Sequence, residues 1–162
     1  MRGADRATQV ASRHWETLLE ECRAIETEFS EDGWETLLIQ PGTITTVYER
    51  DRCGLDVLVP GNQYEPLAGW VEEDGIPFPH SEVYCREETE VVLLVVVMQE
   101  PEARKVVVFP AYYGREDEEG LFERASKEGE LNTYLRKLNG EMVVFSHDDP
   151  DIFRPPENGQ RP

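Results

Sequence analysis

Positive charge is scarce in this chain. Only 16 of the 162 residues are basic against 34 acidic ones, for a net charge of −18, and only Lys105, Lys127 and Lys137 are lysines. Nucleic-acid binding depends on basic patches that neutralise phosphates. The densest basic stretch, residues 50–52, has an aspartate inside it. The sequence therefore predicts no nucleic-acid partner.

Long hydrophobic runs are also absent. The most apolar stretch, residues 89–98, is shorter than the roughly 18 residues of a membrane-spanning helix. The arginines near the N-terminus are not followed by the apolar segment of a secretion signal. Cys22, Cys53 and Cys85 are odd in number and widely spaced, so we expect reduced thiols and no disulfide framework. Together these features predict a cytoplasmic protein with no membrane association.

Recognisable catalytic motifs are missing as well. The chain has no Gly-rich phosphate loop, no Walker lysine, no Gly-x-Ser-x-Gly elbow and no Cys-x-x-Cys pair. Residues 80–85 come closest to a metal cluster, with one loose pair in His80 and Cys85. Cys53 and His147 join that pair only if folding brings them there, and packing is the simpler interpretation. We therefore predict no catalytic residue, no metal ligand and no cofactor.

Two other patterns resemble parts of known active sites. Residues 147–149, His-Asp-Asp, resemble a carboxylate-supported histidine, but adjacent residues do not share a face, and a proline-rich segment follows. Asp56 with Glu102 and Lys105 resembles the acid and Glu-x-Lys set of metal-dependent nucleases, but the spacing is wrong. Neither pattern indicates an active site.

Carboxylate is abundant where lysine is scarce. A small domain needs a net charge of only about 2 to 8 for solubility, whereas a charge of −18 repels itself. Salt removes this cost, because the Debye length falls to about 3 Å near 1 M. The composition resembles that of cytosolic proteins of extremely halophilic archaea, from an uncharacterised family. The alternative is a mesophilic acidic protein that mimics nucleic acid, but here the acid is dispersed instead of forming a block.

The N-terminal segment predicts a long helix over residues 5–30. Apolar side chains recur at 3-4-3-4 spacing along one face: Trp15, Leu18, Cys22, Ile25 and Phe29. We expect this stripe to pack on a sheet of the same chain. The alternative is that the heptad-like stripe meets a twin helix and forms a homodimer.

The rest of the chain reads mainly as strands. Predicted strands cover residues 34–40, 43–50 and 55–59 as a meander, then 81–86, 89–98, 105–113, 131–138 and 141–146. Predicted helices cover residues 63–73 and 116–128, and residues 131–138 suit either state. The apolar run at 89–98 predicts a central strand with antiparallel neighbours, and Asn139-Gly140 predicts a hairpin turn.

These elements predict a single α+β domain at residues 5–149. We expect a mostly antiparallel sheet of six to eight strands, packed with the long N-terminal helix and one or two shorter helices. Residues 1–4 are predicted to be a flexible N-terminus. Residues 150–162, rich in proline, are predicted to be a flexible tail.

The function predicted from these absences is a non-catalytic cytosolic interaction or regulatory domain adapted to high salt. A homodimer or another protein is the expected kind of partner. The alternative is a small-ligand-binding protein or an enzyme with a pocket near Tyr84, Tyr112 and Tyr113, because Tyr112-Tyr113-Gly114 ends a predicted strand, where ligands often bind. A co-purified molecule or a deep polar cleft would favour the alternative.

Overall fold

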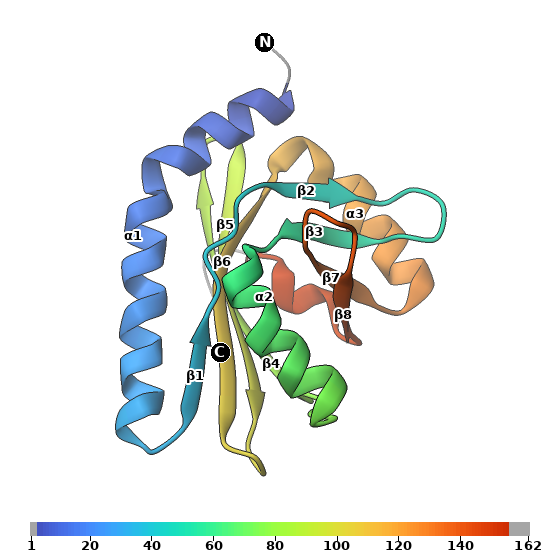
Figure 1. Cartoon of the computed structure of the whole chain (residues 1–162). Coiled ribbons are helices and arrows are strands. Elements are labelled where there is room, and N and C mark those ends of the chain that lie inside the picture. The colour runs from blue at the N-terminus through green and yellow to red at the C-terminus, as the bar shows by residue number, and fades with distance from the viewer. Residues whose placement is uncertain (1–2, 156–162) are drawn as a thin grey trace.

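One long helix covers a whole side of the molecule (Figure 1). The computed structural model describes residues 3–155, and its first element is α1 (Gly3–Glu31). Leu18 and Cys22 are buried on the helix, with Trp15, Ile25 and Phe29 packed around them against strand residues of the same chain. The predicted helix and its intrachain packing are thus confirmed, and the stripe is not open to a twin helix.

Sheet A lies directly under α1. Its strand order is β1-β6-β5-β4, with bounds β1 (Glu35–Leu38), β6 (Lys105–Gly114), β5 (Val91–Glu100) and β4 (His80–Glu88). Along β5, Val91, Leu93, Val95 and Val97 pack toward α1, and the alternate side chains pack into the core on the other face. Burial on both faces explains the uninterrupted apolar run and confirms β5 as a central strand.

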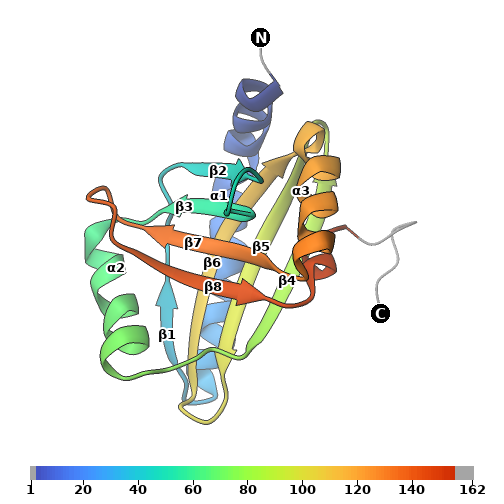
Figure 2. The ribbon, with the colours of Figure 1, turned by 90° about the vertical axis from the view of Figure 1, so that its right-hand side faces the viewer.

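Sheet B packs on the opposite face of sheet A. Its order is β2-β3-β7-β8, with bounds β2 (Ile44–Val47), β3 (Gly54–Leu58), β7 (Leu131–Arg136) and β8 (Met142–His147). In Figure 2 it stands in front of sheet A, and its strands run across those of sheet A. The inner side chains, among them Leu55, Leu135 and Phe145, join the core between the sheets.

Shorter helices close the sides of that core. They are α2 (Gly61–Ala68), which continues into a π-helical turn (Gly69–Glu73), and α3 (Arg115–Glu128). Leu67 of α2 and Leu121 of α3 are fully buried between the layers. The predicted helix over residues 116–128 is confirmed, and residues 131–136, which the sequence left open, form a strand.

The predicted sheet arrangement was partly wrong. The fold is α+β as expected, but the strands form two mixed four-stranded sheets instead of one mostly antiparallel sheet of six to eight strands. The predicted meander at residues 34–59 does not form, because β1 leaves its chain neighbours and pairs in parallel with β6, Glu35 opposite Lys105. A second parallel pair joins β3 to β7. Local sequence pattern indicates a strand but not its distant partner.

The end of the described chain is packed against the core. Within the predicted flexible tail, residues 150–162, Pro150–Phe153 form a 3-10 turn. Phe153 is fully buried, and the Tyr113 hydroxyl donates a hydrogen bond to its carbonyl oxygen (2.9 Å). The remaining predicted flexible segments fall partly on residues 1–2 and 156–162, which lie outside the described residues.

None of the helices between residues 3 and 155 combines the length and the apolar character needed to cross a membrane.

Candidate interaction surface

The described residues leave the outer face of sheet B uncovered. Successive side chains of a strand point to opposite faces, so the residues that alternate with the buried core of sheet B point away from sheet A. Helix α1 covers the outer face of sheet A, whereas Figure 2 shows no element of residues 3–155 in front of sheet B. The side chains of this face are exposed on the edge strand β8, whereas Asp56, Asn132 and Tyr134 of the inner strands are 7–8% exposed.

A buried carboxylate lies at the centre of this face. Asp56 of β3 is 7% exposed and is held between Arg52 (2.6 Å) and Arg136 (3.0 Å). The Arg52 guanidinium also stacks 4.5 Å from the ring centroid of Tyr134, which pairs with Asp56 across the β3–β7 ladder. Two arginines thus pair with the carboxylate, which makes it a structural anchor of the face.

One end of the face is polar and internally satisfied. The Ser146 hydroxyl donates to the Asn132 side-chain oxygen (2.6 Å), and the Asn132 amide donates to the Cys53 carbonyl oxygen (3.3 Å). Gly54 has a φ of +148°, and a Cβ there would collide with the Asn132 carbonyl oxygen. Only glycine therefore permits the close approach of β3 and β7 at this end.

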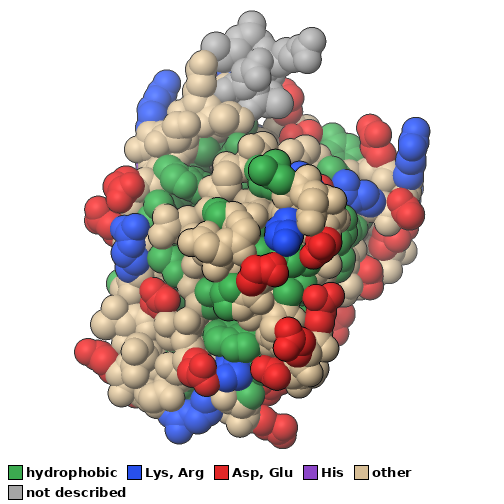
Figure 3. Space-filling model, viewed as in Figure 1, with side chains coloured by type: hydrophobic (Ala, Val, Ile, Leu, Met, Phe, Trp, Pro, Cys, Tyr) green, Lys and Arg blue, Asp and Glu red, His purple; other side chains and the backbone are tan. Residues whose placement is uncertain are grey.

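The other end of the face is apolar. Leu138 is 86% exposed, Val144 46% and Met142 39%, and Leu58 at the end of β3 lines a cavity together with Leu138. We call these four residues the apolar patch. In the view of Figure 1, Figure 3 shows hydrophobic side chains reaching the surface among acidic and basic ones. Exposed apolar side chains in so acidic a chain make this face the candidate interaction surface.

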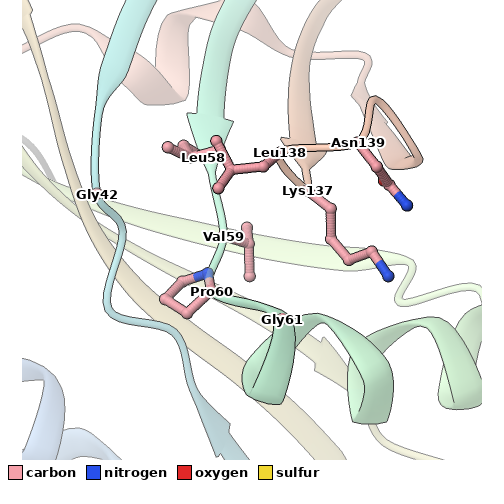
Figure 4. A pocket seen from close by; sticks show the side chains of 8 residues that line it. All are labelled: Gly42, Leu58, Val59, Pro60, Gly61, Lys137, Leu138 and Asn139. Atoms are coloured by element: carbon pink, nitrogen blue, oxygen red, sulfur yellow. The ribbon is translucent and has the colours of Figure 1, made fainter.

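A cavity of about 370 Å³ opens beside the patch. Figure 4 shows its lining, which comes from β3, the start of α2 and the β7–β8 hairpin: Gly42, Leu58, Val59, Pro60, Gly61, Lys137, Leu138 and Asn139. The one charged side chain there, Lys137, is paired with Glu65 (3.3 Å) and Glu141 (3.8 Å). The cavity thus offers apolar walls without a vacant ionic anchor, which suits an apolar side chain better than a polar metabolite.

A second constellation lies buried at the seam between the two sheets. His147 of β8 is 4% exposed, and its Nδ1 and Nε2 atoms lie 3.1 Å from the hydroxyl oxygens of Ser81 and Thr133. Burial lowers the pKa of His147 to about 4, so the imidazole is a poor base near neutral pH. The trio links sheet A to sheet B. The sequence carried no signal for it, because its members come from three separate strands.

The metal-ligand candidates do not converge. The Cys85 thiol donates to the Ile152 carbonyl oxygen (3.5 Å), and the Cys53 thiol donates to the Leu121 carbonyl oxygen (3.7 Å). His80 is exposed at the start of β4. No group of three or more His, Cys, Asp or Glu side chains in the described part of the chain is placed to hold a metal ion.

The nuclease-like residues are also far apart in the fold. Lys105 pairs with Glu35 (2.6 Å) in sheet A, and Glu102 lies in the β5–β6 turn, where its backbone N–H donates to Glu100. Asp56, by contrast, lies on the outer face of sheet B. The structure therefore assembles no Asp, Glu and Lys set.

The three tyrosines proposed as pocket residues do not share one site. Tyr112 faces α1, with its ring 6.2 Å from that of Trp15. Tyr113 is the next residue and points to the opposite face of sheet A, where burial raises the pKa of its hydroxyl and Phe153 accepts its hydrogen bond. Tyr84 is 55% exposed on the edge strand β4. Alternation along β6 separates the first two, which the sequence pattern already implied.

Comparison with known proteins gives one match. A family model described as a family of unknown function (DUF7529) matches residues 2–155, the whole extent of the two-sheet fold. No curated protein and no solved structure matches the chain.

Proposed function

The chain belongs to this family of unknown function, DUF7529, and we propose that it is a non-catalytic interaction domain that binds another polypeptide through the outer face of sheet B. The carrying observation is the apolar patch. Leu138, Met142 and Val144 are exposed on a chain with a net charge of −18, beside a cavity with apolar walls. Exposed apolar side chains of this kind gain free energy when a partner removes them from water.

The geometry suggests how a partner binds. An apolar side chain of the partner enters the cavity between Leu58 and Leu138, and burying one such side chain contributes about 1.5–3 kcal/mol. Met142 and Val144 extend the contact along β8. The Asp56 cluster at the centre of the face keeps the face rigid, because Arg52 and Arg136 are already held in place by the carboxylate.

The ionisable groups near this face support a role without catalysis. Asp56 is occupied by Arg52 and Arg136. Lys137 is paired with two glutamates, and both ring nitrogens of His147 lie within hydrogen-bond distance of hydroxyls. None of the three is a poised nucleophile or base.

A small apolar ligand is the second candidate for the cavity, because its volume of about 370 Å³ is within the range of ligand pockets. In this candidate the ligand binds at the rim of sheet B, whereas the alternative predicted from the sequence placed it near the three tyrosines. It needs no catalytic group.

A photo-crosslinking residue at position 138 tests the proposed function. Position 126, exposed on α3, is the matched control. We expect a discrete protein adduct, either with the chain itself or with another protein of the source cell, at position 138 but not at position 126. An adduct of only a few hundred daltons would favour the small ligand, and no adduct at position 138 would contradict both candidates.

We further propose that the domain works in the salt-filled cytoplasm of a halophile. The support is the charge of −18, spread along the chain, with acidic side chains scattered over the surface that Figure 3 shows. Screening removes the self-repulsion, so the urea midpoint of unfolding should rise with KCl up to molar concentration. Full stability in low-salt buffer with no gain from KCl would contradict this proposal.

A further inference from the structure

Strand β8 has an open edge. Among the described residues it forms one ladder, with β7, where Lys137 N–H donates to the Glu141 carbonyl oxygen (2.8 Å) at the hairpin. Hydrogen-bonded pairs recur every two residues in an antiparallel ladder, so Val143 and Phe145 bond toward β7. The N–H and C=O groups of Met142, Val144 and Ser146 therefore point away from β7. No backbone group within residues 3–155 bonds to them outside the ladder.

This edge lacks the devices that protect other edges. Charged side chains and short strands discourage edge-to-edge pairing. The edge strand β4 carries Glu82, Arg86, Glu87 and Glu88, and the edge strands β1 and β2 are four residues long. Strand β8 has six residues, MVVFSH, with no Asp, Glu, Lys, Arg or Pro, in a chain whose residues are 31% charged. Its exposed side chains include Met142 and Val144 of the apolar patch.

We infer that the partner of this surface is a second copy of the chain, joined by antiparallel pairing of β8 with β8. This inference rests on the proposed function and names the partner that meets the β8 edge of the face; the cavity wall at Leu58 of β3, two strands from β8, stays outside this pairing. A twofold axis at Val144 places it opposite the partner subunit's Val144, and places Met142 opposite the partner subunit's Ser146. In each copy, Met142, Val144 and Ser146 then each donate one hydrogen bond to the other copy and accept one from it. The pairing forms six hydrogen bonds between the two copies. The two four-stranded sheets B become one continuous sheet.

The flanking charges fit this register. Glu141 lies opposite the partner subunit's His147, whose buried ring is neutral, and Asp148 lies opposite the partner subunit's Gly140. Sliding the pairing by two residues, so that the axis lies at Phe145, would instead bring Glu141 opposite the partner subunit's Asp149, a like-charge pair. The two chains repel each other at long range because each carries −18. Dimer affinity should therefore rise with KCl.

The apolar side chains also favour a second copy. Met142 and Val144 are 39% and 46% exposed in the single chain. The axis brings the two Val144 side chains together on the outer face, with Met142 of each copy next to the pair. One edge thus buries the same uncharged surface on both copies, which is what an isologous interface requires.

Sedimentation equilibrium of the full chain in KCl tests the dimer. We expect a monomer–dimer equilibrium that tightens as KCl rises. Val144→Pro removes an outward N–H that the fold itself does not use, and should weaken the dimer at least about tenfold through the lost hydrogen bonds. Val144→Thr keeps the N–H and the β-branched shape, and should change the affinity less than about threefold. Circular dichroism checks that both variants fold.

A charge-swap experiment tests the register independently of proline. Val144→Lys and Val144→Glu each place like charges opposite each other in the proposed dimer, so each variant alone should be monomeric. Their mixture should form a heterodimer. The experiment uses the lowest KCl concentration at which the wild-type dimer persists, because screening weakens the discrimination.

Two results would overturn the inference. One is a wild-type chain that stays monomeric at every protein and KCl concentration. The other is a dimer that Val144→Pro and the lysine and glutamate variants leave unchanged. In either case a protein adduct at position 138 with a different protein would leave the proposed function standing, whereas absence of any such adduct would remove that function as well.

Discussion

Two pairs of consecutive valines summarise the difference between the sheets. In sheet A, Val95 and Val96 are 2% and 0% exposed, because α1 covers one face and sheet B the other. In sheet B, Val143 is 4% exposed and Val144 is 46% exposed, because only the inner face is covered. The same residue type thus builds a scaffold in one sheet and a displayed surface in the other. The functional difference lies in which faces are covered.

The largest expected effect on stability comes from a carboxylate placed inside sheet A, compared with the same change on the outer face of sheet B. Val96→Asp buries a carboxylate without a partner and should cost more than about 4 kcal/mol, which is enough to prevent folding. Val144→Asp should change the free energy of unfolding by less than about 0.5 kcal/mol. Urea unfolding in molar KCl measures both, at a protein concentration low enough that the wild-type chain is monomeric. Comparable losses in the two variants would mean that the outer face of sheet B is covered after all.

The next largest effect is the pH dependence of stability that His147 should produce, because it is buried where the two sheets meet. The pKa of His147 falls from 6.5 to about 4 on folding, so the unfolded chain binds more protons between these values. Stability should therefore be full above about pH 7 and fall as the pH drops through 6.5 toward 4, by roughly 3 kcal/mol from this group. His147→Gln is the control, because it cannot titrate. The difference between the two unfolding curves isolates the histidine from carboxylates that titrate nearby.

An identical acid dependence in wild type and His147→Gln would contradict this account of the seam. His14 and His80 are the same in both proteins, so the comparison isolates His147.

A smaller effect is expected inside the outer face itself. Asp56→Asn removes the charge that Arg52 and Arg136 share, and should cost roughly 1–2 kcal/mol, since the arginines are partly exposed and regain water. Asp51→Asn, at an exposed site in the β2–β3 connection, should leave the free energy of unfolding nearly unchanged. Thermal unfolding of the two variants measures how much the Asp56 cluster stabilises the fold. Equal stability would mean that Asp56 contributes no anchor.

The sequence predicted the buried elements well and the displayed surface poorly, for physical reasons. The 3-4 stripe of α1 and the apolar run of β5 report burial directly, and Asn139-Gly140 marked the β7–β8 hairpin. The run Met142-Val143-Val144-Phe145 is apolar on both faces, so no alternation showed that Val144 points to solvent. The parallel pairing of β1 with β6 and the meeting of Ser81 with His147 depend on distant chain segments.

Amide hydrogen exchange at two neighbouring residues of β8 tests the central claim most directly. Val143 N–H bonds to β7, so it should be protected at every protein concentration. Val144 N–H points to the open edge, so it should exchange fast in dilute solution and slow down as the protein concentration rises in molar KCl. Exchange at Val144 that stays fast up to millimolar protein would contradict the claim that this edge is where sheet B meets its partner.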